Sequence, residues 1–230
     1  MISVCMAVKN GEQFLGAQLD SILLQLGADD EVVISDDHSS DNTLNVLNSY
    51  SDPRIRVMTN PRTGLVNNFE HALSNSGGEV IFLSDQDDVW MPHKIKSTLP
   101  FFNEYDLVVS DCCIVSERLD SLHDSFFEIN SSSHGLFRNL LHNSYMGCCM
   151  AFKRSILKKA LPFPTNLVTH DQWLGLTAEL YGRVTFIPDK LILHRRHDQN
   201  ASSTANESKQ KWSRKISNRY SLIKNLIYAR

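Results

Sequence analysis

The feature that most constrains the fold is an alternation of short apolar segments with longer amphipathic ones over the first 85 residues. The apolar runs predict buried strands at 2–8, 30–37, 55–60 and 79–85. The segments between them have apolar residues at helical spacing and predict helices at 11–26, 40–50 and 64–76. This order predicts an α/β fold with a mostly parallel central sheet and helices on both faces.

After residue 90 the alternation is less regular. We predict helices at 91–104 (after Pro92) and 171–182, a strand at 105–115, a strand that runs into a helix at 147–161, and one or two short strands at 183–197. The polar segments predict a loop or lid at 116–135 and a linker or flexible lid at 198–208.

Composition limits the class of protein. A chain of 230 residues with 42% hydrophobic and 21% charged residues suits one globular domain with a tail. Its net charge of −3 implies no general nucleic-acid partner. No apolar run reaches the roughly 18 residues of a membrane-spanning helix, and the start at Met1 lacks the basic residues of a signal peptide.

The five cysteines do not have the spacing of a disulfide framework or a zinc site. Cys5 is alone, and the others form two adjacent pairs, Cys112 with Cys113 and Cys148 with Cys149. We expect buried, reduced side chains, as in a cytoplasmic protein.

The C-terminal segment predicts a basic amphipathic helix at 206–230. Its apolar residues are spaced by three and four positions, with basic residues between them: Trp212, Ile216, Tyr220, Ile223 and Ile227, against Lys211, Arg214, Lys215, Arg219 and Lys224. Two interpretations stay open. The helix packs on protein, or it contacts an anionic membrane surface.

Three carboxylates, Asp85, Asp87 and Asp88, directly follow the fourth predicted strand in the segment 82–92. Their mutual repulsion needs a compensating positive charge. Hard carboxylate oxygens at a strand end suit Mg²⁺ or Mn²⁺, which could also neutralise a diphosphate. The alternative is a solvated acidic turn, although Trp90 would be unusual there.

Two other carboxylate positions can serve chemistry. Asp36 and Asp37 end the second predicted strand, where a carboxylate could accept the imide N–H of a uracil or thymine ring. Ser40 or Asp41 is expected to cap the helix that follows. Asp171 stands at a helix start, where it could be an N-cap or a general base.

Seven motifs in order carry a resemblance over residues 2 to about 202: VKNGEQFL, SDDHSSDNT, NPRTGLVNNFEHAL, FLSDQDDVWMP, GCCMAF, HDQWL and RRHDQN. This pattern resembles the family 2 glycosyltransferases with the GT-A fold, particularly bacterial rhamnosyltransferase-like members that build surface polysaccharides. The resemblance implies a GT-A domain at 1–205, with a nucleotide-sugar-binding half at 1–90 and an acceptor half at 91–205.

The resemblance also implies an inverting transfer of a sugar, rhamnose as a guess, from a nucleotide-diphosphate donor to a hydroxyl of a surface polysaccharide or a lipid-linked glycan. Asp171 would be the catalytic base. The roles that it implies for other residues are donor binding by Ala7, Lys9, Asp36, Asp37, Asp88, Arg195 and Arg196; metal binding by Asp85, Asp87 and His197; and acceptor contact by His170 and Trp173.

Two positions depart from the family pattern. Many relatives have Glu where this chain has His170, and an aromatic residue where it has His194. The acceptor contacts of this protein are therefore expected to differ. A lipid-linked acceptor and a basic C-terminal helix would place the protein in the cytoplasm, at the inner face of the membrane as a peripheral protein.

Two other functions compete with this one. A noncatalytic module that binds sugar nucleotides or glycans would not need the set of Asp85, Asp87 and Asp171. A nucleotidyltransferase has a similar sheet, but the first predicted strand here lacks a glycine-rich phosphate loop with an Arg or Lys nearby.

Overall fold

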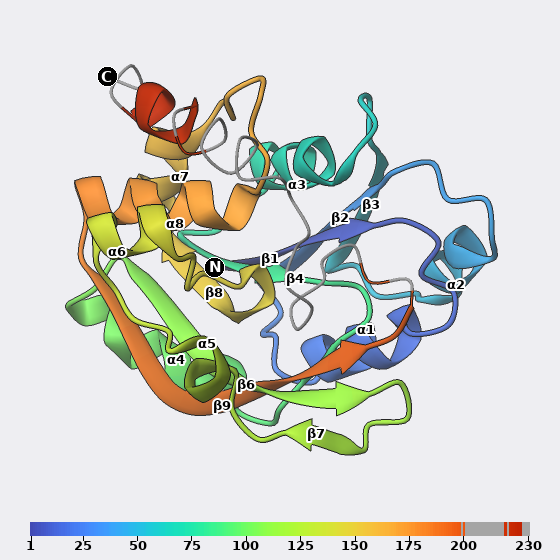
Figure 1. Cartoon of the computed structure of the whole chain (residues 1–230). Helices are drawn as coiled ribbons and strands as arrows, with labels where there is room; N and C mark the ends of the chain where they lie inside the picture. Colours follow the sequence, from blue (N-terminus) through green and yellow to red (C-terminus); the bar gives the residue numbers. More distant parts are fainter. Residues whose placement is uncertain (199, 201–218, 220, 227–230) are drawn as a thin grey trace.

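The structure is a computed structural model that describes residues 1–198, 200, 219 and 221–226. One curved sheet of nine strands runs through the molecule, with helices on both sides (Figure 1). The predicted α/β fold class is therefore confirmed. Along the sheet the strand order is β3-β2-β1-β4-β8-β6-β9-β5, and β7 pairs with β6.

The first half of the chain forms the parallel part of the sheet. Its strands and helices are β1 (Ile2–Val8), α1 (Leu15–Leu23), β2 (Glu31–Asp36), α2 (Thr43–Ser49), β3 (Ile55–Thr59), α3 (Leu65–Ser74) and β4 (Val80–Ser84). β1 lies between β2 and β4, and both pairings are parallel. Every residue of β1 and β2 is buried, as expected of strands that are covered on both faces. These elements appear in the predicted order.

The second half of the sheet is mixed, which differs from the mostly parallel sheet that the sequence predicts. Its strands are β5 (Val89–Trp90), β6 (Leu107–Ser116), β7 (Ser121–His123), β8 (Met150–Lys153) and β9 (Val184–Arg196). β8 lies antiparallel between β4 and β6, whereas β9 runs parallel to β6. β9 is one long strand, and register shifts beside Asp111 interrupt its pairing with β6.

The other helices of the second half are short, except for α8. They are α4 (Lys94–Thr98), the 3-10 helix η1 (Leu99–Asn103), α5 (Phe126–Asn130), α6 (Leu136–Leu141), the 3-10 turn η2 (Gly147–Cys149), α7 (Arg154–Ala160) and α8 (His170–Tyr181). The predicted loop at 116–135 thus contains β7 and α5. Ser125 caps α5 by accepting a hydrogen bond from the N–H of Glu128.

One apolar core extends across the described part of the chain, from Ile2 to Leu226. Four of the cysteines are buried, Cys113 is half-buried, and all five are free thiols. This agrees with the interpretation of the cysteines as small apolar side chains. The division of the chain at residue 90 stays a prediction.

Most of the predicted C-terminal helix at 206–230 lies outside the described residues, as does most of the linker at 198–208. Residues 219 and 221–226 are helical, and Leu222 and Leu226 are buried. Arg219 donates a hydrogen bond of 2.6 Å to the carbonyl of Leu141. Among the described residues, no helix is long and apolar enough to cross a membrane.

The turn before β4 brings two backbone segments into contact at Gly78. A Cβ at this position would lie 2.5 Å from the N atom of Ser3, which a strand of the sheet holds in place. Gly78→Ala is therefore expected to lower the free energy of unfolding by roughly 1–3 kcal/mol. Urea denaturation followed by circular dichroism measures this change.

Gly16 supplies the matched control. It lies in α1, and the nearest atom to its added Cβ is 3.6 Å away, an ordinary contact. Because Ala is the better helix former, Gly16→Ala should leave the stability unchanged or raise it by up to about 1 kcal/mol. Equal losses in both variants would contradict the close approach at Gly78.

Candidate functional site

A cavity of about 320 Å³ lies where β1, β2 and β4 end and α8 begins. Its lining comprises Ala7, Val8, Lys9, Asp37, Leu65, Asn68, Asp85, Gln86, Asp87, Met146, Gly147, Val168, Thr169, His170, Asp171, His194 and Asn200. Seven of the residues that the sequence proposes for a site are among them. Their convergence follows from the topology, since the carboxyl ends of adjacent parallel strands meet at one edge of a sheet.

At one end of the cavity, Asp37 is held by several donors. Its carboxylate accepts hydrogen bonds from Lys9 Nζ (3.1 Å), Asn60 Nδ2 (3.1 Å) and the N–H of Gly64 (3.1 Å). Burial alone would raise the pKa of Asp37, but these donors hold it below its usual value. Gly64 has φ +102°, a conformation that favours glycine.

Asp36 has a different role from Asp37. Its carboxylate bonds the N–H and the hydroxyl of Ser39, at 3.0 and 2.5 Å, so it stabilises the turn after β2 and does not line the cavity. The helix that follows is stabilised by Asp41, which accepts from the N–H of Thr43 at 3.0 Å. The N-cap of α2 is Asn42, without a side-chain cap bond, so the predicted cap at Ser40 or Asp41 is wrong, and Asp41 acts from one residue before the cap.

Gln86 joins the loop after β4 to the loop after β1. Its Oε1 accepts from the N–H of Lys9 at 2.8 Å, and its Nε2 donates to the carbonyl of Lys9 at 3.0 Å. Because Lys9 also pairs with Asp37, Gln86 connects the acidic loop to the Asp37 end of the cavity. Sequence analysis did not single out Gln86.

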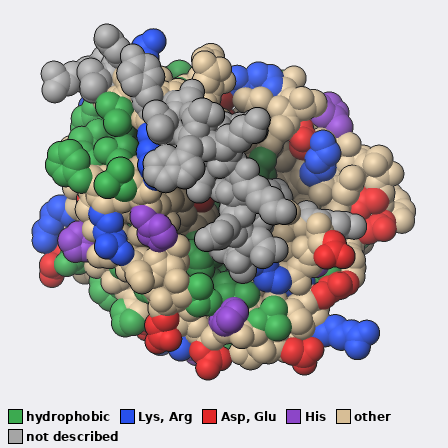
Figure 2. Space-filling model, in the orientation of Figure 1, with side chains coloured by type: hydrophobic (Ala, Val, Ile, Leu, Met, Phe, Trp, Pro, Cys, Tyr) green, Lys and Arg blue, Asp and Glu red, His purple; other side chains and the backbone are tan. Residues whose placement is uncertain are grey.

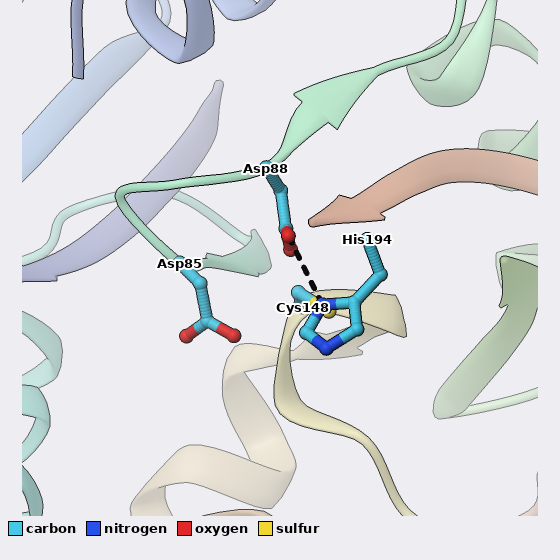
Figure 3. Close-up of side chains that lie close together, drawn as sticks. All are labelled: Asp85, Asp88, Cys148 and His194. Atoms are coloured by element: carbon cyan, nitrogen blue, oxygen red, sulfur yellow. Dashed lines mark hydrogen bonds and ion pairs between the residues drawn. The ribbon is translucent and has the colours of Figure 1, made fainter. Parts of the chain in front are cut away.

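The acidic loop is packed into the protein. Trp90 is only 2% exposed, and Asp87 and Asp88 are buried as well. The alternative interpretation of this stretch as a solvated acidic turn is therefore wrong. The compensation of charge comes from the end of β9, which lies beside the loop (Figure 3).

Each of the three carboxylates has its own surroundings. Asp88 accepts from His194 Nδ1 and from the N–H of Arg195, both at 3.0 Å. Asp87 is bonded by His197 Nε2 at 2.8 Å and by Asn200 Nδ2 at 3.1 Å. Among the described residues, none donates a hydrogen bond to the carboxylate of Asp85, which lies apart from the Asp88–His194 pair in Figure 3.

The pKa values follow these contacts. Burial and the charges of Asp88 and Asp87 raise the pKa of Asp85 well above its usual value, and burial and Asp88 raise that of Asp87. Burial would raise the pKa of Asp88 too, but His194 holds it below its usual value. The pKa of His194 rises to about 9, because the attraction of Asp88 outweighs the effect of burial. The pairing with Asp88 therefore favours the protonated form of His194.

Arg195 fixes the acidic loop. Its Nε donates to the carbonyl of Asp87 at 2.8 Å, its Nη1 donates to the carbonyl of Glu117, and its guanidinium lies 4.6 Å from the ring of Phe14. Neither Arg195 nor the half-buried Arg196 lines the cavity. Binding of phosphate by these two residues stays a prediction.

The chemistry of the loop fits a divalent cation. Ligand atoms of Asp85, Asp88, Cys148 and His194 lie within 4.8 Å of one another (Figure 3), but Asp88 and His194 already pair with each other. Asp85 has no side-chain donor among the residues that the structure describes, and Asp87 lines the cavity with it. Hard oxygen ligands of this kind suit Mg²⁺ or Mn²⁺.

Asp171 lies in the first turn of α8 and lines the cavity. The helix is preceded by Thr169 at the N-cap, and Asp171 Oδ1 accepts from the next N–H, that of Gln172, at 2.6 Å. The interpretation of Asp171 as an N-cap is therefore wrong. Burial raises the pKa of Asp171 to about 6.

The two neighbours of Asp171 that the sequence assigns to the acceptor lie in different places. His170 lines the cavity, stacks on the ring of Phe69 at 4.0 Å, and has its pKa lowered to about 3 by burial, so it is neutral. Trp173 is buried in the core, where its indole N–H donates to the carbonyl of Ala160 at 2.9 Å. The structure does not bring Trp173 to the cavity.

Three asparagines near the cavity were also missed by sequence analysis as individual residues. Asn60 bonds Asp37, Asn68 donates to the carbonyl of Val8, and Asn200 bonds Asp87. Each lies within or beside a motif, but its role depends on a partner more than 20 residues away. Spacing along the sequence gives no signal for such pairs.

Comparison with known proteins is consistent with this arrangement. The sequence model of the family described as "Glycosyl transferase family 2" matches residues 3–161, more than half of the chain. The chain is 27% identical to the dTDP-rhamnosyl transferase RfbG of Shigella flexneri, with 91% of this chain and 77% of that protein covered.

Two further proteins are similar. One is the UDP-Glc:alpha-D-GlcNAc-diphosphoundecaprenol beta-1,3-glucosyltransferase WfgD of Escherichia coli, which is 27% identical over 71% of this chain and 64% of that protein. The other is S. aureus TarS 1–349 in complex with UDP-GlcNAc, whose crystal structure superposes with a TM-score of 0.75 at 21% identity, covering 97% of this chain and 66% of that one. The likeness to TarS shows the GT-A fold. The family match shows that the chain belongs to glycosyltransferase family 2, as the motifs predict.

Proposed function

We propose that this enzyme is an inverting glycosyltransferase that uses a nucleotide-diphosphate sugar and in which Asp171 is the general base. The observation that supports this most directly is the position of Asp171. Its carboxylate, with a pKa of about 6, lines the same cavity as Asp37, Asp85 and Asp87. A base with a pKa near the operating pH is both deprotonated and able to take a proton.

The donor would lie along the cavity with its base at the Asp37 end. Asp37 is a charged acceptor that is held in place by its donors, and Ala7 and Lys9 border it. A carboxylate there suits the imide N–H of a uracil or thymine ring. The diphosphate would then reach Asp85 and Asp87. A Mg²⁺ or Mn²⁺ ion held by these two residues would neutralise charge on the leaving diphosphate.

The chain's own residues would carry the proton transfer. The acceptor oxygen attacks the anomeric carbon from the face opposite the diphosphate, its proton passes to the Asp171 carboxylate, and the bond from the anomeric carbon to the diphosphate oxygen breaks. A single displacement of this kind inverts the configuration. His170 would border the acceptor as a neutral ring, so it adds no charge beside the base. His197 would keep Asp87 oriented.

The relatives suggest the substrates. Transfer of rhamnose from a dTDP donor follows the name of RfbG, and an acceptor joined to a lipid through a diphosphate follows the name of WfgD. We propose a lipid-linked precursor of a surface polysaccharide as the acceptor. Such an acceptor would place the reaction in the cytoplasm, at the inner face of the membrane.

Asp171→Asn is expected to lower kcat by roughly 10²–10⁴, the contribution of a general base, while donor binding persists. In the unmodified enzyme kcat should rise with pH through about 6, because only the ionised carboxylate accepts a proton. Transfer assays from pH 5 to 8 measure both effects. Asp189→Asn, at an exposed carboxylate, is the control. Near-normal turnover of Asp171→Asn would exclude Asp171 as the base.

The same substitution should change stability in a pH-dependent way. The folded-state pKa of Asp171 is about 6, above the usual 3.8, so its ionisation costs stability as pH rises between these two values. At pH 8, Asp171→Asn should therefore have a free energy of unfolding about 3 kcal/mol above that of the unmodified protein, and a higher melting temperature. At pH 4 the difference should vanish. Melting curves at the two pH values test the sign.

Donor class and metal dependence can be measured together by thermal shift. A nucleotide diphosphate that binds only the folded protein raises the melting temperature. We expect dTDP or UDP to do so more strongly with Mn²⁺ than without it, and Asp87→Asn to remove the Mn²⁺-dependent part. Asp37→Asn should instead weaken the preference among bases. A shift that is unchanged in both variants would exclude this donor site.

Gln86→Ala tests the connection between the two loops. Loss of its two hydrogen bonds to the backbone of Lys9 should raise the KM for the donor roughly fivefold to thirtyfold, because each partly exposed bond contributes about 1 kcal/mol. At saturating donor, kcat should stay within about twofold of normal. Gln13→Ala is the control, since its exposed side chain bonds Glu117 outside the cavity. An unchanged KM would show that the bridge does not order the donor site.

A further inference from the structure

A second cavity, distinct from the catalytic one, is lined only by apolar and aromatic side chains. It has a volume of about 370 Å³ and lies between α6, the end of α8 and the helical residues 221–226. Its lining includes Leu136, Phe137, Leu140, Leu180, Tyr181 and Ile223. We call it the apolar groove. Among the described residues that line it, Tyr181 alone carries a polar atom in its side chain, the phenolic hydroxyl.

The apolar side chains around the groove are unusually exposed to water. Phe137 is 80% exposed and Leu141, also in α6, is 67% exposed. The hydrophobic side chains at the upper left of Figure 2 form a continuous patch over this part of the molecule. Contiguous apolar surface of this kind is costly in water and marks a binding face more often than isolated exposed leucines do.

Basic side chains border the groove. Lys159 Nζ lies 5.3 Å from the ring of Tyr181, and the guanidinium of Arg219 bonds the carbonyl of Leu141. The exposed Lys224 follows Ile223, whereas Arg138 of α6 donates to the carbonyl of Ser131. We call Lys159, Arg219 and Lys224 the basic rim. A carboxylate nearby, Glu179, is engaged by the hydroxyl of Tyr145 at 2.8 Å and by the N–H of Gly135.

An apolar groove with a basic rim matches the chemistry of an anionic lipid bilayer. Hydrocarbon chains fill an apolar groove, and phosphate groups pair with Lys and Arg at the membrane surface. A second protein with an acidic rim would fit the charges, but a groove whose described lining has only the Tyr181 hydroxyl for hydrogen bonding offers such a partner little specificity.

The groove is also placed suitably for a lipid-linked acceptor. α8 starts at the catalytic cavity, where Asp171 lies, and ends at the groove with Leu180 and Tyr181. At 1.5 Å per residue the two sites are roughly 14 Å apart along the helix axis. An acceptor whose lipid lies in the bilayer could thus extend its sugar to the base.

We propose that the apolar groove and the basic rim form a face that docks on an anionic membrane, with lipid hydrocarbon in the groove and lipid phosphate on the rim. This inference rests on the proposed function for its biological purpose, but not for its test. It differs from membrane contact by the basic C-terminal helix alone, because α6 and α8 supply most of the groove.

The test is flotation of the full chain with vesicles of phosphatidylglycerol and of phosphatidylcholine. The unmodified protein should float with phosphatidylglycerol, bind phosphatidylcholine at least tenfold more weakly, and be released by high salt. Phe137→Asp with Leu141→Asp should weaken binding to phosphatidylglycerol at least tenfold. Both side chains are exposed, so the double variant should keep its melting temperature within a few degrees.

Leu24→Asp is the matched control, because Leu24 is 88% exposed at the end of α1, far along the chain from the groove. It should float like the unmodified protein. Failure of the unmodified protein to bind phosphatidylglycerol, or equal binding by the double variant, would overturn the proposal. A dimer in light scattering that the double variant abolishes, without vesicle binding, would assign the face to a second copy and overturn it as well.

Nucleotide thermal shifts on the same proteins separate this proposal from the proposed function. The double variant should keep the nucleotide shift of the unmodified protein, since neither residue lines the catalytic cavity. Loss of vesicle binding by the double variant, with an intact nucleotide shift, supports both the docking face and the proposed function. If the double variant loses vesicle binding, and neither it nor the unmodified protein shows a nucleotide shift, the docking face is supported and the donor site is contradicted.

Discussion

The site depends on how three carboxylates, the half-buried Asp85 and the buried Asp87 and Asp88, are kept in one loop. Asp85, Asp87 and Asp88 would repel one another strongly in a region from which water is excluded. The end of β9 relieves this repulsion, because His194 pairs with Asp88 and His197 with Asp87. Asp85 is left without a protein donor in the described chain, so it keeps its affinity for a cation.

The first half of the fold could be predicted from the sequence because its strands are buried on both faces. Such strands are continuous apolar runs, and the polar residues that end them mark the edge of the sheet. For the same reason Asp37, Asp85 and Asp87 could be identified as residues that meet. Asp171 could be located through its motif, although only the structure shows that burial raises its pKa and that Thr169 precedes the helix instead of a capping Asp171.

The rest could not be predicted, because it depends on pairing between distant segments. The insertion of β8 between β4 and β6, against the direction of both, leaves no trace in the local pattern of β8. Gln86 has an unremarkable position between two aspartates, and its role exists only because Lys9 lies beside it. Trp173 lies in the same motif as Asp171, but helical geometry turns it to the core two residues later. A motif fixes which residues are near in sequence, and helix direction decides which of them face the cavity.

The pairing of Asp88 with His194 has a consequence for folding during synthesis of the protein. The two residues are 106 positions apart, so at roughly 5–20 residues per second a ribosome makes the histidine about 5–20 s after the aspartate. During this interval the parallel strands β1 to β4 are already synthesised, while the acidic loop still lacks β9 and the basic side chains at its end. The edge of the cavity formed by β1 to β4 is thus encoded first, but its acidic loop is completed last.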